Sequence, residues 1–374
     1  MIAEFYEANK DLLLFGGASA VKVLALLNAV MGFTALLTLA ERKLSALMQD
    51  RVGPNRASVF GLTLNGLFHP VADGIKMLMK EDFVPAKAEK LLFALAPFFA
   101  LVPVLSLFAF IPFGDYVMLA GYKFDLLIAD VPLGLFFILA FSGLAIFAVF
   151  LGGWASKNNF ALLGAMRGVA QMVSYEVVLG LTLVGLMMIY GSASLQDMVR
   201  AQGRLLFGFL PAWGVVTQPL AFVLFLTAAI AENKRTPFDL VEGESEIIGY
   251  FLEYSSMRFA VFMFAEFVEI ILVSMLATTL FFGGWQVPWL YDIGFILPGG
   301  AQLALAHPAV ALLQLGSFAA KTVFFSWFLL VVRWTLPRFR FDQMMALCWK
   351  NLLPLALLNI LATGAVLLAL GMVP

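Results

Sequence analysis

The stretch 259-FAVFMFAEFVEIILVSMLATTLFF-282 decides the fold, because it is long, continuous and apolar. Its only charged side chains are Glu266 and Glu269, three residues apart. A run of about 20 mostly apolar residues is long enough to cross the roughly 30 Å hydrocarbon core of a membrane as a helix. We therefore predict a membrane-spanning helix over residues 259–282.

The whole chain has the composition of an integral membrane protein. Hydrophobic residues make up 62% of its 374 residues and charged residues 13%, whereas globular proteins average about 45 to 50% apolar and about 25% charged. The opening residues MIAEFYEANK are acidic and lack the basic region that begins a cleavable signal peptide. We expect the first hydrophobic stretch to remain in the protein.

The same length criterion predicts an all-α fold, a polytopic bundle of about eight transmembrane helices that forms a single integral membrane domain over residues 1–374. The predicted spans lie near 18–40, 91–112, 131–151, 171–191, 213–231, 259–282, 311–332 and 352–371.

Basic residues are distributed unequally between alternate connections. The connections after odd-numbered spans hold 17 Lys and Arg, and the N-terminal region and the connections after even-numbered spans hold 4, with Lys22 inside the first predicted span and Lys321 inside the seventh. Cytoplasmic connections are enriched in Lys and Arg. We therefore predict that both termini lie on the outer, periplasmic side and that the odd-numbered connections lie in the cytoplasm.

One of these cytoplasmic connections, after span one, has a helical pattern of its own. In residues 66–80, His69 and Asp73 fall on one helical stripe, with Val71 and Ile75 on the opposite stripe. This spacing predicts an amphipathic helix at the membrane surface. On that helix we expect His69 to be solvated or hydrogen-bonded and not a metal ligand.

The chain has few side chains that could hold a redox centre. It contains one cysteine, Cys348, and two histidines, His69 and His307. These are too few for an iron–sulfur cluster, a bis-histidine haem or a structural zinc held by this chain alone. We predict no metal site, so that any electrons are carried by a partner or a diffusible molecule.

A cluster of acids follows the fifth predicted span, with six carboxylates between Glu232 and Glu253. If the segment after Pro237 is helical, four of them share one face: Asp239, Glu242, Glu246 and Glu253. Burial and like-charge repulsion would make such carboxylates coupled proton acceptors. The alternative is a solvated loop that pairs with a partner or with nearby basic residues, namely Lys234, Arg235 and Arg258.

Further carboxylates are predicted near the cytoplasmic ends of the spans. Glu232 ends the fifth span, Glu176 begins the fourth, and Glu266 lies about two turns into the sixth. A charged residue in mid-bilayer costs about 2.5 to 3.5 kcal/mol on insertion scales, so such residues usually mark ion or proton routes. We interpret them as a proton-accessible path from the cytoplasmic face. The alternative is structural ion pairs, and Lys321 in span seven is a possible partner of Glu266 and Glu269.

Four motifs in the connections carry a family resemblance. They are AERKLSALMQDRVGPNR at 40–56, GAMRGVAQMVSYEV at 164–177, RTPFDLVEGESE at 235–246 and RWTLPRFRFDQMM at 333–345. In these motifs, in their order along nearly the whole chain and in the number of spans, the sequence resembles the quinone-proximal membrane subunit of respiratory complex I. That family includes the bacterial subunit and its mitochondrial counterpart, NADH dehydrogenase subunit 1.

The resemblance implies a subunit without a redox centre in a proton-pumping NADH:quinone oxidoreductase. It implies a quinone chamber lined by Glu41, Arg42, Arg51, Asp73 and Arg333. It also implies a proton path through Glu176, Glu232, Asp239, Glu242, Glu244, Glu246 and Glu266. Glu269 stands where the family pattern leads us to expect a neutral residue.

The resemblance further implies partners and a location. Quinone is the expected substrate, and FMN, NADH and iron–sulfur clusters are expected in partner subunits. The expected partners are the hydrophilic quinone-reducing subunits of the peripheral arm and the small and antiporter-like subunits of the membrane arm, with no nucleic acid. The expected location is the bacterial inner membrane, as a multi-pass protein.

Other functions stay open at this point. A homologous membrane subunit of an energy-converting hydrogenase or formate hydrogenlyase would share the fold without a quinone chamber. A stand-alone transporter would place its site near the midplane, often with repeat symmetry, and a passive anchor would not explain Glu266 and Glu269. The sequence does not distinguish ubiquinone from menaquinone, or NADH from ferredoxin as the electron donor to the complex.

Overall fold

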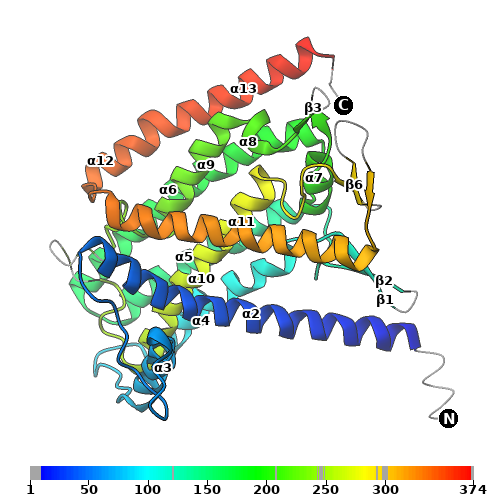
Figure 1. Ribbon diagram of the computed structural model, residues 1–374. Coiled ribbons are helices and arrows are strands. Elements are labelled where there is room, and N and C mark those ends of the chain that lie inside the picture. Colours follow the sequence, from blue (N-terminus) through cyan, green and yellow to red (C-terminus); the bar gives the residue numbers. More distant parts are fainter. Residues whose placement is uncertain are drawn as a thin grey trace.

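The computed structural model describes residues 10–119, 122–206, 209–241, 243, 247, 249–291, 294–296 and 302–371. Long helices run side by side through the molecule, and short strands gather at one end of them (Figure 1).

The elements follow one another in an almost wholly helical order. The long helices are α2 (Lys10–Met48), α4 (Lys90–Leu107), α5 (Gly134–Ala155), α6 (Asn159–Tyr190), α10 (Ser256–Phe281), α11 (His307–Thr335) and α13 (Leu353–Ala369). The shorter helices are α3 (His69–Met79), α7 (Leu195–Gln202), α8 (Gly214–Thr217), α9 (Pro219–Glu232) and α12 (Phe341–Ala346), with short turns η1 (Leu64–Gly66), η2 (Phe108–Phe110) and the π-helical η3 (Leu347–Leu352). The strands are β1 (Tyr116–Leu119), β2 (Tyr122–Asp125), β3 (Leu205–Leu206), β4 (Leu210–Pro211), β5 (Leu290–Tyr291), β6 (Gly294–Ile296) and β7 (Gln302–Ala304).

The helix α10, predicted over 259–282, lies at the centre of the bundle (Figure 1). It contacts α2, α4, α9 and α11, and almost every side chain from Glu266 to Phe281 is buried. A helix that is hydrophobic on all sides must be surrounded by other helices or by lipid. Since α10 is surrounded by protein, its two glutamates lie inside the bundle.

Seven helices in the described part of the chain are long and apolar enough to cross a membrane, and each overlaps one of the predicted spans. The fold is therefore a polytopic helical bundle.

The fifth predicted span, 213–231, differs from the prediction. The structure has the short α8, a break at Gln218, and then α9, which at 14 residues is about 21 Å long. Pro219 lacks an N–H and disfavours helical backbone at Gln218, which explains the break. The buried Gln218 side chain accepts a hydrogen bond from Asn359 (2.7 Å) and donates one to Thr363 (2.6 Å), both on α13.

The fourth span begins twelve residues earlier than predicted, because α6 starts at Asn159. The side chain of Asn158 accepts a hydrogen bond from the N–H of Phe160 (3.0 Å) and so caps the helix. The side-chain Nε2 of Gln171 donates to the backbone carbonyls of Ala231 and Phe238 (2.7 and 2.8 Å), whereas its buried Oε1 has no hydrogen-bond partner among the described residues. The prediction that Glu176 begins the fourth span is therefore wrong, since Glu176 lies about 25 Å along α6 from Asn159.

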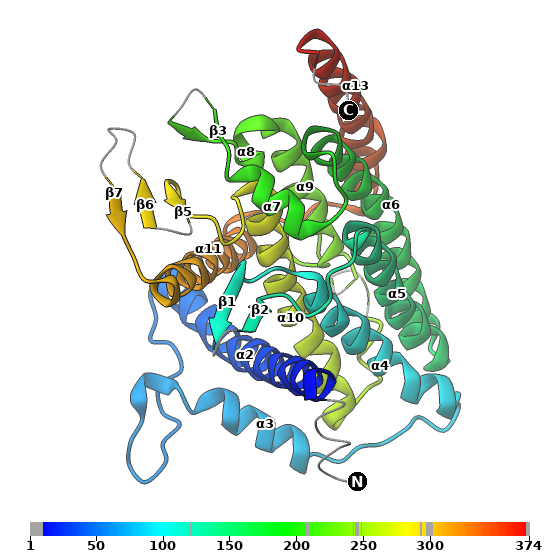
Figure 2. The same ribbon diagram turned by 90° about the vertical axis from the view of Figure 1, so that its right-hand side faces the viewer.

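Connections alternate between the two ends of the bundle. The connections after α4, α6 and α10 carry the antiparallel strands at one end, and α3, α12 and the segment after α9 lie at the other (Figures 1 and 2). Odd-numbered and even-numbered predicted connections thus lie at opposite ends. We call the end with α3 and α12 the α3 end.

The helix α3 follows α2 and contacts both α2 and α10. Its apolar side chains Val71, Ile75 and Leu78 are exposed in this chain. The ring nitrogen Nδ1 of His69 lies 3.0 Å from the carbonyl oxygen of Gly66, within hydrogen-bonding distance.

Lys321 of α11 does not pair with Glu266 or Glu269, so the suggested pairing is wrong. Its ammonium donates to the backbone carbonyls of Phe282 (2.8 Å), Gly284 (3.0 Å) and Gln286 (2.7 Å). These carbonyls follow the end of α10, about 20 Å along the helix from Glu269. Helix C-termini leave carbonyls without partners and favour cations. Lys321 supplies both a donor and a positive charge at the C-terminus of α10.

We predict that Lys321→Met destabilises the protein by about 2 to 4 kcal/mol, because three carbonyls lose their donor. The measurement is thermal unfolding in mild detergent. Lys123→Met, at an exposed position in the β1–β2 hairpin, is the matched control. Equal unfolding midpoints for the two variants would contradict this role of Lys321.

Candidate functional site

The buried carboxylate of Glu41, near the α3 end of α2, joins three elements. Only 7% of Glu41 is exposed. Its Oε2 accepts a hydrogen bond from Nη1 of Arg235 (2.6 Å), in the segment after α9, and its Oε1 accepts one from Nη1 of Arg333, near the end of α11. Segments nearly 300 residues apart in sequence thus meet at one side chain.

Arg235 continues this connection to α10. Its Nη2 lies 3.9 Å from Oε2 of Glu266, and its guanidinium lies 4.3 Å from the centre of the Phe267 ring. Arg235 is 7% exposed and Glu266 is 4% exposed. We call Glu41, Arg235, Glu266 and Arg333 the Glu41 cluster. Within it Arg235 lies between two carboxylates.

The Glu41 cluster is incompletely hydrogen-bonded. Among the described residues, Nε and Nη2 of Arg235 and Oε1 of Glu266 are buried without a hydrogen-bond partner. Unpaired polar atoms in a protein interior are costly and often occur where water, a ligand or a mobile proton is used. This cluster is therefore chemically different from a fully satisfied structural ion pair.

A second pair lies one helical turn further along α10. Nζ of Lys234 lies 3.6 Å from Oε1 of Glu269, and both side chains are buried. Lys234 and Arg235 are adjacent in sequence, and Glu269 and Glu266 are separated by three residues on the helix. The two basic residues therefore face two successive acids of α10.

A small cavity of about 40 Å³ adjoins Glu269. We call it the Glu232 cavity, because Glu232, Glu269 and Ser142 are the hydroxyl and carboxyl groups on its otherwise largely apolar wall. A site of about 10 to 15 Å³ is enough for one water molecule when polar groups surround it. This cavity is larger than that, and Glu232, Glu269 and Ser142 are the groups that could bind the water.

Glu176 approaches the same region from α6. A methyl group placed on Gly143 of α5 would lie 3.0 Å from Oε1 of Glu176, and Gly143 follows the cavity residue Ser142. The carboxylates of Glu176 and Glu269 are both close enough to Glu232 to interact with it electrostatically. Carboxylates of α9 and α10 thus line the cavity, and the Glu176 carboxylate of α6 lies beside Gly143, next to the lining residue Ser142.

Asp239, in the segment after α9, accepts a hydrogen bond from Nη2 of Arg338 (2.7 Å). Burial raises the pKa of Asp239 above the usual range, and the nearby Arg338 partly opposes that effect. Glu242, Glu244 and Glu246 lie outside the described residues.

The described residues after Pro237 are not helical, so the expected common face of Asp239 and Glu253 is wrong. Asp239 pairs with Arg338, whereas Glu253 accepts a hydrogen bond from Asn158 (2.6 Å). Pro237, Gly243 and Gly249 disfavour a helix in this segment, and contacts to other elements replace the helical hydrogen bonds.

Three predicted chamber residues lie outside the buried clusters. Nη1 of Arg42 lies 2.5 Å from Oδ2 of Asp73 on α3, and the Arg42 side chain is 50% exposed. Arg51 is exposed, and its Nε donates to Oε1 of Gln49 (2.6 Å). The structure therefore brings Arg42 and Asp73 together, whereas Arg51 is bonded to Gln49.

Sequence reasoning underestimated several basic residues. Lys234 and Arg235 entered it only as partners for a solvated loop, and Arg338 was not singled out. The signal for Lys234 and Arg235 is present in the sequence, since NKR at 233–235 directly follows an apolar span that ends in Glu232. Long-range pairing with Glu41 and Glu269 cannot be read from that adjacency.

The family model described as NADH dehydrogenase matches residues 21–364. The chain belongs to this family. Its relatives include the NADH-quinone oxidoreductase subunit designated H of Thermomicrobium roseum, 47% identical over 91% of this chain and 93% of the relative. The corresponding subunit of Geobacter metallireducens, designated H 1, is 45% identical over 93% and 95% of the two chains. That of Rhizobium meliloti, designated H 2, is 41% identical over 95% and 99%.

Family membership confirms the resemblance drawn from the four motifs. It also confirms the prediction that the chain is a subunit of an oxidoreductase complex, because the relatives are named as subunits of such an enzyme. Within the described ranges no group of three or more His, Cys, Asp or Glu could hold a metal ion.

We predict that Arg235→Gln destabilises the protein by about 3 to 5 kcal/mol, because it leaves the buried Glu266 without its counter-charge and Glu41 with Arg333 alone. Adding Glu41→Gln should recover part of this loss in a double-mutant cycle of unfolding in detergent. Arg42→Gln, which breaks an exposed pair, should cost under about 1 kcal/mol. Strict additivity of the two buried substitutions would contradict direct coupling between Glu41 and Arg235.

We predict that Asp239 makes the protein less stable as the pH rises. Its raised pKa means that the folded state holds the proton to higher pH than the unfolded state, so stability falls from the unfolded pKa, about 3.9, up through the folded value. Asp239→Asn should lessen that fall. Unfolding in detergent at a series of pH values tests this, and an unchanged slope would contradict it.

Proposed function

We propose that this chain is the quinone-proximal membrane subunit of a proton-pumping NADH:quinone oxidoreductase, and that it couples quinone reduction to proton movement. The single observation that carries the proposal is Arg235, buried between Glu41 and Glu266. Quinone reduction consumes two electrons and two protons for each quinol formed. A subunit that couples this reaction to proton transfer needs buried charges that respond to it.

In this proposal Glu41, Arg42, Arg51, Asp73 and Arg333 line the quinone chamber at the α3 end. Glu41 and Arg333 form a direct ion pair, so a change of charge in the chamber acts on the Glu41 carboxylate. Coulomb interactions are many times stronger in a protein interior than in water. A change of charge in the chamber therefore also acts on Arg235, because Arg235 and Arg333 bind the same Glu41 carboxylate.

Arg235 then transmits the change to α10. Its contact with Glu41 is close, at 2.6 Å, and its contact with Glu266 is loose, at 3.9 Å. While Arg235 stays at the Glu41 carboxylate, the counter-charge of Glu266 is distant, which favours the protonated form of Glu266. If Arg235 moves toward Glu266, that proton is released.

From Glu266 the proposed path continues toward Glu269 and the Glu232 cavity. Glu269, Glu232 and Glu176 come from three helices, and the cavity has room for water between carboxyl groups. Asp239, together with Glu242, Glu244 and Glu246, supplies protons to the path from the α3 end. Proton transfer along such a chain needs groups at hydrogen-bonding distance, directly or through one water.

The proposal includes an orientation in the membrane. The α3 end holds most of the basic residues of the connections, so it faces the cytoplasm, and both termini face the periplasm. The chain is one integral membrane domain of the bacterial inner membrane. The hydrophilic quinone-reducing subunits bind at the α3 end, and FMN and the iron–sulfur clusters belong to partner subunits. The small and antiporter-like membrane subunits lie beside the helices.

We predict that Glu266→Gln lowers quinone reduction and proton pumping together, by about tenfold or more, because a proton acceptor is lost. The measurement is inhibitor-sensitive NADH:quinone activity and proton uptake in vesicles that contain the assembled complex. Glu253→Gln is the matched control, because Glu253 is bound to Asn158 away from the path.

Electron transfer from NADH to an artificial acceptor upstream of quinone should survive in the Glu266→Gln complex. Unchanged pumping would remove Glu266 from the path. Hydrogen evolution or formate-linked activity in the unmodified complex would replace the quinone function by that of an energy-converting hydrogenase.

A further inference from the structure

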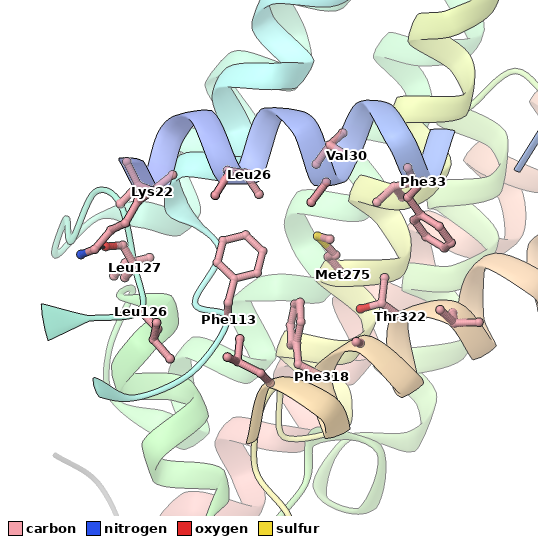
Figure 3. A pocket seen from close by; sticks show the side chains of 17 residues that line it. Lys22, Leu26, Val30, Phe33, Phe113, Leu126, Leu127, Met275, Phe318 and Thr322 are labelled. Carbon is pink, nitrogen blue, oxygen red and sulfur yellow. Dashed lines mark hydrogen bonds between the residues drawn. The ribbon is translucent and has the colours of Figure 1, made fainter. Parts of the chain in front are cut away.

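A second site lies in the half of the bundle away from the Glu41 cluster. A cavity of about 480 Å³ opens between α2, α10, α11 and the connection that holds β1 and β2. Figure 3 shows Leu26, Val30 and Phe33 of α2 on one wall and Phe318 of α11 on the other. We call this cavity the α2–α11 groove. Its volume is in the range of ligand-binding pockets, about 300 to 1,000 Å³.

The wall of the groove is apolar apart from the side chains of Lys22 and Thr322, which lie at separate places. Lys22 of α2 lies at one end, next to Leu126 and Leu127 (Figure 3). Its ammonium donates to the backbone carbonyls of Asp125 (2.6 Å) and Leu127 (3.3 Å). Both acceptors are uncharged, so these hydrogen bonds hold the ammonium in place without neutralising it.

The length of the groove matches one leaflet of a membrane. From Lys22 to Phe33 the helix α2 rises about 16 Å, at roughly 1.5 Å per residue. Half of the hydrocarbon core of a bilayer is about 15 Å thick. A chain that enters beside Lys22 and reaches Phe33 therefore spans one leaflet.

We propose that the α2–α11 groove binds one acyl chain of an anionic phospholipid from the leaflet on the Lys22 side, with its phosphate beside Lys22. The apolar wall excludes a polar ligand, and the fixed ammonium selects a negative headgroup. Because a basic residue near an anionic lipid surface contributes about 1 kcal/mol, Lys22 gives an anionic lipid about a fivefold advantage over a zwitterionic lipid.

Thr322 provides an internal check on the chemistry of the occupant. Its hydroxyl is buried, lines the groove between α10 and α11, and has no hydrogen-bond partner among the described residues. A hydrocarbon chain does not use that hydroxyl. A ligand with a polar group at depth, such as a quinone, would accept a hydrogen bond from it.

The experiment uses the complete complex, purified in detergent, stripped of loosely held lipid and titrated with phosphatidylglycerol or with phosphatidylcholine of the same acyl chains. Native mass spectrometry counts the bound lipid. Ala319→Phe fills the groove from α11 and Ala29→Phe fills it from α2, so that either variant serves if the other does not assemble. Ala320→Phe, exposed on α11 outside the groove, is the matched control.

The expected result is one tightly bound phosphatidylglycerol fewer in the groove-filling variants than in the unmodified and Ala320→Phe complexes. Lys22→Gln should lower the fivefold preference for phosphatidylglycerol to about one, and Lys123→Gln, in the neighbouring hairpin, should keep it. Thr322→Val should bind both lipids as the unmodified complex does.

Three results would overturn the proposal. The first is an equal lipid count in the groove-filling and control variants. The second is loss of binding in Thr322→Val, which would indicate an occupant with a polar group at depth. The third is release of a partner subunit from the groove-filling complexes, which would show that a protein segment covers the groove.

Discussion

The Arg235 guanidinium, buried between the carboxylates of Glu41 and Glu266, is the contact on which the α3 end of the molecule depends. Together with Arg333 it ties α2, α10 and α11 to the segment after α9. Removing one member of a buried ion pair is far more costly than the pair is stabilising, because the remaining charge cannot reach water. These elements are therefore held in one arrangement, and a small movement of Arg235 changes the surroundings of both acids.

The rest of the bundle is held by other means. Apolar helices gain little from leaving lipid for each other, so their association depends on close packing and on hydrogen bonds between helices. Gly168 of α6 fits against Val149 and Val241, and Gln171, Gln218 and Lys321 each bridge separate elements through hydrogen bonds. Polar residues inside this membrane protein thus serve two purposes, since some fix helix ends and others form the incompletely satisfied cluster at the candidate site.

The sequence showed which acidic side chains lie in apolar spans, but not which basic residues they contact. Glu266 was recognisable because a carboxylate inside an apolar span is expensive. Its partner was not, since Lys321, inside the seventh predicted span, was the suggested partner and the structure uses Arg235 instead. Glu176 was misplaced because Asn159 and Arg167 lower the hydropathy of the stretch before residue 171, whereas α6 already begins at Asn159.

The sequence by itself determined the helical membrane fold, seven of its long helices and the family, because span length and loop motifs are local properties that need no knowledge of neighbours. Only the tertiary structure decided the break at Gln218, the meeting of Glu41 with Arg235 and Arg333, and the groove between α2 and α11. Each of these depends on contacts between residues far apart in the chain. Such contacts follow from the way whole helices pack, which no single stretch of sequence specifies.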